Sequence, residues 1–339
     1  MARAMNKLSP PPAALLELAT GYQRSKTLFA LVEFGVPTLL AGRSLPLAEI
    51  ASALGVHPLA ADRFLNAGVA LGLLERLGDK FRNTALAEQF LVRDEPTYLG
   101  DQFALYDRAS YPTWSDLAEK LRRWRPGATD DRPPVDADQG ADSMRAQHNL
   151  AVMVGHALGQ AYDFSAHRRM LDLGGGTAGM SLGVCGLHPG LRAVVYDLPE
   201  VAEVARELIR AGGMEGRIEV VTGNFKTDEL PGGFDLALLA NLLSVASEAT
   251  NRELLARVYG QLPEGGAVIL SGWILDNGRT SPLIPVLFCL EDINWEAPDV
   301  ERSAATYEGW LADAGFSEIE RRVYCPPTSM IVGRKAGRG

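Results

Sequence analysis

The 339-residue sequence has three cysteines, and Cys185, Cys289 and Cys325 stand far apart without paired spacing. Neither a disulfide framework nor a zinc cluster is indicated, and no metal site is expected. Long apolar runs are missing as well, because no stretch approaches the roughly 20 apolar residues of a membrane span. The start, MARAMNKLSPPP, lacks the apolar core of a signal peptide. We expect a cytoplasmic protein without a membrane partner.

Positive charge is in deficit. The 33 lysines and arginines are outnumbered by 42 aspartates and glutamates, so the net charge is −9. Binding to nucleic acid or to an anionic membrane needs a basic surface and is disfavoured. The hydrophobic fraction of 47% is ample for a core, and the length exceeds what one core usually holds. Two domains and small neutral partners are therefore expected.

The first part of the chain, residues 12 to about 123, carries apolar residues at helical spacing. Within it, residues 46–84 predict a helix, a turn at Gly55, a second helix and a hairpin turning at Gly78 and Asp79, the outline of a winged helix. Such a module can bind DNA. Its basic residues are offset by as many acidic ones, which favours a structural or dimerising role. These charges are Arg63, Arg76, Lys80 and Arg82 against Glu49, Asp62, Glu75 and Asp79.

The rest of the chain has the pattern of an α/β fold. After an expected exposed loop at residues 125–142 and a helix around 144–161, compact apolar runs alternate with helical stretches. This alternation is typical of a parallel sheet covered on both faces. The last two runs, SEIERRVY and SMIVGRK, are separated only by CPPT, and so short a connection requires an antiparallel pair. We predict a Rossmann-like domain with a terminal antiparallel hairpin.

A glycine-rich turn follows the first of these runs. The stretch LDLGGGTAG places Asp172 at a strand end and Gly174, Gly176 and Gly179 in the turn that enters a helix. Such glycines let backbone amides approach a nucleotide-like cofactor, although a tight turn alone would also explain them. Asp197 ends the next run, where a carboxylate accepts both ribose hydroxyls.

Two further residues suit an adenine. Asn224 and Phe225, after the following run, offer an amide for its edge and a ring for its face. NAD and S-adenosylmethionine would both fit these features. The position of Asp172 favours S-adenosylmethionine, because a carboxylate just before the glycines suits a cationic amino-acid group better than a pyrophosphate. The terminal hairpin favours it too.

Together with the winged helix, the stretches LDLGGGTAG, YDLPEV, GNF, LPEGGAVIL and ERSAATYEGWLADAGF make the chain resemble the bacterial caffeate-type S-adenosylmethionine-dependent O-methyltransferases. The resemblance covers nearly the whole chain. It implies a winged-helix dimerisation domain at 1–110, connecting helices and a loop at 111–165 that form part of the acceptor pocket, and a methyltransferase domain at 166–339. It implies a homodimer and a cofactor site at Asp172, Gly174, Gly176, Asp197, Leu198, Asn224, Phe225 and Asn241.

The sequence departs from this family where the family has its catalytic base. In place of roughly L-K-x-I-L-H-D-W-x-D the chain has LANLLSVASE, so that Ser244 replaces the histidine, Val245 the aspartate and Ala240 the lysine. Serine is far too weak a base to deprotonate a hydroxyl near neutral pH. Three explanations remain open: the acceptor needs no strong base at this position, the base comes from another part of the chain, or the chain no longer methylates. Bacteriochlorophyllide C-methyltransferases are similar in lacking this histidine. Asn224 also departs from the usual aspartate, but its carbonyl can still accept from an adenine amino group.

Three other residues are candidates for the missing base. His148 and His156 lie two helical turns apart on the helix that lines the acceptor pocket in the family, and His156 is the first choice. Glu301 aligns with an acidic residue that flanks the family's base. Packing, capping or exposure to solvent would explain each histidine equally well, and the start of a helix would by itself favour Glu301.

We therefore predict an S-adenosylmethionine-dependent methyltransferase that acts on a small aromatic or conjugated acceptor of secondary or pigment metabolism. The methyl group goes to carbon or nitrogen, or to oxygen with a non-standard base. Two alternatives stay open. One is an enzyme that uses the cofactor for rearrangement or hydroxylation without net methyl transfer, and the other is a regulator that binds a small ligand.

Overall fold

The computed structural model describes residues 12–125, 137–294 and 302–337. The chain divides into two compact units, the first ending at Ala109 and the second beginning at Ser110. The segment 111–165, expected to connect two domains, thus belongs to the second unit. Glu301 lies outside the described residues. Within the described ranges, no helix is both long and apolar enough to cross a membrane.

The first unit contains the predicted winged helix. Its elements are α2 (Ala13–Ala19), α3 (Gly21–Glu33), α4 (Val36–Leu39), β1 (Leu45–Pro46), α5 (Leu47–Leu54), α6 (Pro58–Ala70), β2 (Leu74–Leu77), β3 (Lys80–Asn83), α7 (Ala85–Leu91) and α8 (Gly100–Leu105). A π-helical turn, η1 (Tyr106–Ser110), follows and ends on the first residue of the second unit. α5 ends at Gly55, which takes a left-handed φ of 65°. The strands form one antiparallel sheet in the order β1-β3-β2, and its core includes Leu31, Ile50 and Phe81.

The second unit is built around a seven-stranded sheet. Its strands are β4 (Arg169–Leu173), β5 (Arg192–Asp197), β6 (Ile218–Thr222), β7 (Leu236–Ala240), β8 (Ala267–Gly272), β9 (Ser317–Cys325) and β10 (Thr328–Arg334), in the order β6-β5-β4-β7-β8-β10-β9. The strands from β4 to β8 are parallel, and β10 is antiparallel to both β8 and β9. The predicted Rossmann-like sheet with a terminal hairpin is confirmed.

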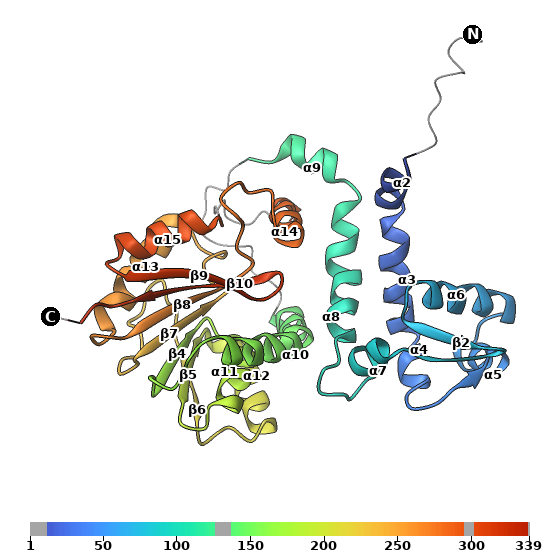
Figure 1. Cartoon of the computed structure of the whole chain (residues 1–339), viewed down its shortest axis with the longest axis horizontal. Coiled ribbons are helices and arrows are strands. Elements are labelled where there is room, and N and C mark those ends of the chain that lie inside the picture. Colours follow the sequence, from blue (N-terminus) through green and yellow to red (C-terminus); the bar gives the residue numbers. More distant parts are fainter. Residues whose placement is uncertain (1–11, 126–136, 295–301, 338–339) are drawn as a thin grey trace, which may run out of the picture. The chain divides into compact units, whose positions relative to one another are not determined.

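Helices cover both faces of this sheet (Figure 1). α10 (Ala137–Ala161), α11 (Gly179–Leu187) and α12 (Pro199–Ala211) pack on one face, and α13 (Glu248–Gln261) and α15 (Ala304–Asp313) on the other. η2 (Tyr111–Trp114), α9 (Leu117–Arg123) and α14 (Leu283–Asn294) complete the unit. α10 begins at Ala137, within the segment that the sequence was expected to leave as a loop, and so is longer than predicted.

The order of the strands determines where a ligand can bind. From β4 the chain proceeds outward to β5 and β6, then returns to place β7 on the other side of β4. In parallel α/β sheets, a crevice opens at the carboxyl ends of the two strands where the order reverses. The glycine-rich turn leaves β4, and the stretch that begins at Asn241 leaves β7. Both therefore lie at this switch point.

Candidate active site

The glycine turn, residues 174–178, joins β4 to α11. Gly174 and Gly176 have φ values of 69° and 56°, a left-handed conformation that favours glycine. A Cβ on Gly174 would lie 2.6 Å from Cδ1 of Leu242, whereas a Cβ on Gly176 would meet no atom within 4 Å. The left-handed φ therefore favours a glycine at position 174, and a larger residue there would also displace the Leu242 side chain, while the backbone of Gly176 faces open space that a ligand can enter.

Asp197 ends β5 beside this turn. Its Oδ2 accepts a hydrogen bond from the amide of Gly176 at 2.8 Å, and its Oδ1 accepts one from the amide of Leu198 at 2.7 Å. Burial raises the pKa of the carboxyl group, and these two bonds oppose the rise. Each oxygen can accept a second bond, so the carboxylate can still bind two hydroxyls. The side chain of Leu198 is 43% exposed and offers apolar surface next to it.

Asp172 lies behind the glycine turn. On β4 its side chain points, like that of Met170, toward the face covered by α11, since alternate residues of a strand share a face. It is fully buried, and its Oδ2 accepts a hydrogen bond from Ser181 Oγ at 2.6 Å. Burial, opposed by Ser181, raises its pKa to about 6. The sequence suggested instead that this carboxylate faces a cationic group, but no surface is left for such a contact.

A second turn, residues 224–228, follows β6 and carries the two residues expected at an adenine. Asn224 Oδ1 accepts a hydrogen bond from the amide of Lys226 at 3.0 Å, and the amide of Asn224 donates to Asp228 Oδ2 at 2.9 Å. Arg257 of α13 donates to the carbonyl oxygen of Phe225 at 2.6 Å and also to that of Asp228. The Asn224 oxygen, expected to accept from adenine, thus already has one donor, while its Nδ2 group can donate to a ring nitrogen.

The serine loop, residues 241–247, leaves β7 at the switch point. Asn241 takes a left-handed φ of 54°, and its amide donates to the carbonyl oxygen of Ser271 at 2.8 Å. The hydroxyl of Ser244 donates to the carbonyl oxygen of Asn241 at 2.9 Å. The loop reads NLLSVAS and contains no titratable side chain. It therefore presents a hydroxyl group but no base.

The two candidate histidines of α10 occupy different environments. His148 is half-buried, with its Nδ1 2.9 Å from Oγ1 of Thr177 in the glycine turn, and burial lowers its pKa. His156 is exposed, and its Nε2 lies 3.2 Å from Nε2 of Gln160. Eight residues turn a helix by about 80° beyond two full turns, so the two side chains diverge. The structure brings His148, not the first choice His156, to the glycine turn.

Several contacts of this site were not found from the sequence. Leu242 under the glycine turn, Thr177 beside His148 and Ser181 on Asp172 each depend on elements packing together. The glycines of α10 and α11 were the available signal, because a Cβ on Gly183 would lie 2.3 Å from the carbonyl oxygen of Val152. Among the residues that the structure describes, no group of three or more histidine, cysteine or acidic side chains could hold a metal ion.

Comparison with protein-family models gives two matches. Residues 133–317 match a model described as an O-methyltransferase domain, and residues 16–93 match one described as an O-methyltransferase dimerisation domain.

Individual relatives agree with these matches over the full length. The chain is 33% identical to 3-hydroxy-5-methyl-1-naphthoate 3-O-methyltransferase of Streptomyces sahachiroi, with 99% of this chain and 100% of the relative covered. It is 33% identical to the N,N-dimethyltransferase OxyT of Streptomyces rimosus, with 89% and 90% covered. The crystal structure of human N-acetylserotonin methyltransferase in complex with S-adenosylmethionine superposes with a TM-score of 0.85 at 27% identity, with 98% and 99% covered.

Proposed function

Because the chain belongs to the O-methyltransferase family that these models describe, we propose that it methylates a small aromatic acceptor at an atom that carries its own reactive electron pair. The chain is an S-adenosylmethionine-dependent methyltransferase with a dimerisation domain. The observation that supports the finer proposal is the 2.9 Å hydrogen bond from Ser244 Oγ to the carbonyl oxygen of Asn241.

The described residues fit the cofactor at the switch point. The open space at Gly176 admits a ligand to the backbone, and Asp197 beside it suits two ribose hydroxyls. When bound, the cofactor supplies a methyl group on a positively charged sulfur. Asp172, which is buried behind the glycine turn, would not contact the cofactor, but its negative charge would attract the positively charged sulfur. The residues that we propose to line the cofactor are Gly174, Gly176, Asp197, Leu198, Asn224, Phe225 and Asn241.

The chemistry of the serine loop limits the acceptor. The proton of the Ser244 hydroxyl is used in the bond to Asn241, so the oxygen offers lone pairs and can accept a hydrogen bond from the acceptor. It cannot remove a proton near neutral pH. A neutral amine nitrogen, or a phenol that is ionised before it binds, needs no such removal. The N,N-dimethyltransferase among the relatives supports a nitrogen acceptor.

A second possibility, in which the base has moved, is favoured by the position of His148. Burial lowers the pKa of His148, so its imidazole is neutral near pH 7 and can accept a proton. If Thr177 donates to Nδ1, the proton of the neutral ring is on Nε2, and a base would need the other tautomer or a water between. His156, exposed and next to Gln160, is the weaker candidate. Glu301 remains a candidate outside the described residues.

A matched panel of acceptors tests the proposal. Full-length protein, S-adenosylmethionine and pairs of aromatic amines and phenols of graded acidity are mixed, and S-adenosylhomocysteine release is followed by mass spectrometry. We expect amines and acidic phenols to react and weakly acidic phenols to react at least tenfold more slowly. Equal rates for phenols of all acidities would show that the enzyme supplies a base. Turnover of cofactor without a methylated product in the NMR spectrum would contradict methyl transfer itself.

We also propose that the chain forms a homodimer through its first unit, since the dimerisation-domain match falls there. The aromatic class of the acceptor is supported by the naphthoate methyltransferase among the relatives.

A further inference from the structure

A buried amide on α13 is bonded to the serine loop. Asn251 lies in the first turn of α13 with no exposed surface. Its Nδ2 donates to the carbonyl oxygens of Leu243 at 2.8 Å and Ala246 at 3.1 Å. Both carbonyls belong to the serine loop and lie on either side of Ser244 and Val245. One side chain therefore fixes the backbone on both sides of the position where the family has its base.

The oxygen of the same amide lacks a partner. Asn251 Oδ1 is buried, and it accepts no hydrogen bond from the residues that the structure describes. A buried, unsatisfied polar atom lowers the stability of the folded protein, and an apolar side chain of similar size would avoid this loss. Packing alone therefore does not explain an asparagine here. The Nδ2 group explains the asparagine, because without it the buried carbonyl oxygens of Leu243 and Ala246 would lack these hydrogen bonds.

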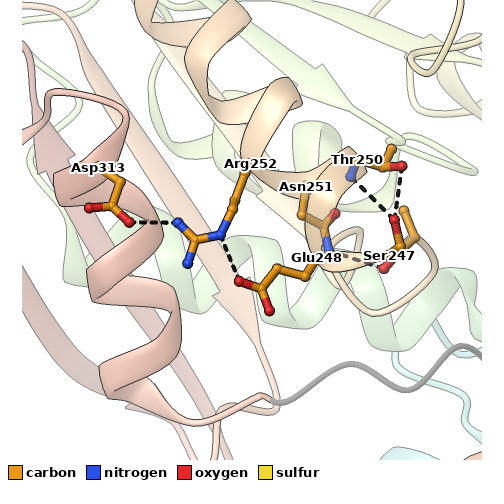
Figure 2. A network of polar contacts seen from close by, with 7 residues as sticks. Ser247, Glu248, Thr250, Asn251, Arg252 and Asp313 are labelled. Carbon is orange, nitrogen blue, oxygen red and sulfur yellow. Dashed lines mark hydrogen bonds and ion pairs between the residues drawn. The ribbon is translucent and has the colours of Figure 1, made fainter. Parts of the chain in front are cut away.

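Capping of α13 does not explain Asn251 either. The N-cap is Ser247, whose Oγ accepts a hydrogen bond from the amide of Thr250 at 3.3 Å and lies 3.1 Å from its Oγ1. Figure 2 shows this pair beside Asn251 at the start of the helix. α13 is therefore capped by Ser247, and the two hydrogen bonds of Asn251 stabilise the serine loop instead.

We propose that Asn251 is a positioning residue for the cofactor site, which it shapes through the serine loop. Its two bonds hold the loop so that Leu242 packs against Gly174, where a Cβ would lie 2.6 Å from Leu242 Cδ1. They also support Asn241, which takes a left-handed φ of 54° that asparagine adopts more easily than most other residues. Loss of the bonds frees both sides of the crevice at the switch point. This inference requires cofactor binding but not the proposed acceptor.

The charged side chains near Asn251 lie in exposed ion pairs, and the buried tyrosine near it is neutral. On the same helix Arg252 donates to Glu248 at 2.7 Å and to Asp313 of α15 at 2.5 Å, and all three side chains are largely exposed (Figure 2). Tyr307 of α15 belongs to the same buried cluster as Leu243, and burial raises its pKa, so it stays neutral. A carboxyl group placed at 251 would be the new titrating group.

The test compares three variants by calorimetric titration with S-adenosylhomocysteine. Asn251→Ala removes both bonds. Asn251→Asp keeps the shape, donates no bond when ionised, and donates one when protonated. Arg252→Ala is the matched control, since it alters the next residue of the same helix without touching the serine loop, and removes the exposed ion pairs with Glu248 and Asp313 and the guanidinium contact with the ring of Trp310. Each affinity is divided by that of the wild type at the same pH, between pH 5.5 and 8.5.

We expect Asn251→Ala to bind S-adenosylhomocysteine roughly tenfold more weakly at every pH, because binding must then order a loop that the two hydrogen bonds hold in the free wild type. Asn251→Asp should be at least as weak at pH 8.5 and should recover several-fold toward pH 5.5. Arg252→Ala should bind like the wild type. Hydrogen exchange of Asn251→Ala should accelerate in residues 241–247 and stay unchanged in β4.

Wild-type affinity in both Asn251 variants would overturn the proposal. An equal loss in Arg252→Ala would overturn it as well, because the effect would then not depend on the two hydrogen bonds of Asn251. Faster exchange throughout the second unit in Asn251→Ala would make Asn251 a general packing residue. If the wild type itself failed to bind S-adenosylhomocysteine, the cofactor assignment would fail instead, which separates the two failures.

Discussion

Cδ1 of Leu242 lies 2.6 Å from the point where a Cβ on Gly174 would stand. A side chain from the loop after β7 therefore fills the space that a side chain in the turn after β4 would need. Leu242 follows Gly174 by 68 residues in the sequence (242 − 174). Their contact joins the two sides of the switch point.

Gly174→Ala should destabilise the protein more than Gly176→Ala. Both alanines would adopt a left-handed φ, which costs roughly 1–2 kcal/mol. Only the alanine at 174 also overlaps Leu242, and overpacking adds about 1–3 kcal/mol. Urea unfolding measures both losses. Adding Leu242→Ala to Gly174→Ala should regain part of the difference, and an equal loss in the two single variants would show that the contact is unimportant.

Asp172→Asn should change how stability depends on pH. Burial raises the pKa of Asp172 to about 6, so the folded protein disfavours the ionised form. The stability associated with the protonated carboxyl is complete below the unfolded pKa of about 4 and is lost as the pH rises through about 6. Asparagine can still accept from Ser181 and does not titrate. The free energy of unfolding of the variant relative to wild type should therefore rise by about 2 kcal/mol from pH 4.5 to pH 8. A constant difference across this range would mean that Asp172 does not titrate there.

Asp197→Ala should weaken S-adenosylhomocysteine binding at least tenfold. Hydrogen bonds to a charged group contribute about 1.5–3 kcal/mol, and the carboxylate also holds the amides of Gly176 and Leu198. Glu200→Gln is the control, since it removes an exposed negative charge three residues away. Calorimetry should separate the two variants, and unchanged affinity in Asp197→Ala would remove this residue from the cofactor site.

The sequence predicted most of the fold and the strand ends at which the candidate cofactor residues lie. Strand and helix patterns placed Gly174, Gly176 and Asp197 at strand ends, because periodicity and turn residues report local structure. It did not show the burial of Asp172, since which face of β4 meets α11 depends on packing. Nor did it separate His148 from His156, because both lie on α10 and only the contact with Thr177 distinguishes them. Asn251 carries no pattern at all, and its role follows from two backbone carbonyls eight and five residues earlier.

Leu18→Glu should dissociate the proposed dimer. Within the first unit α2 has no buried residue, and Leu15, Leu16 and Leu18 are 62%, 56% and 78% exposed. Such an apolar helix in an isolated chain indicates an intermolecular surface. Leu59→Glu, at an exposed position on α6, is the control. Light scattering at micromolar concentration should give a monomer for the first variant and a dimer for the second, and a monomeric wild type would refute the dimer.

The single-turnover rate of Ser244→Ala with the best acceptor of the panel tests whether the serine takes part in the chemistry. In the structure Ser244 donates to Asn241 and cannot serve as a base, so its removal should cost no more than about threefold, the effect of one weak hydrogen bond. Loss of a positioned general base costs 10²–10⁴-fold by comparison. A rate within threefold of wild type, with S-adenosylhomocysteine affinity unchanged, is the result we predict. A fall of 100-fold or more with binding intact would give Ser244 a direct part in the chemistry and contradict the proposed function.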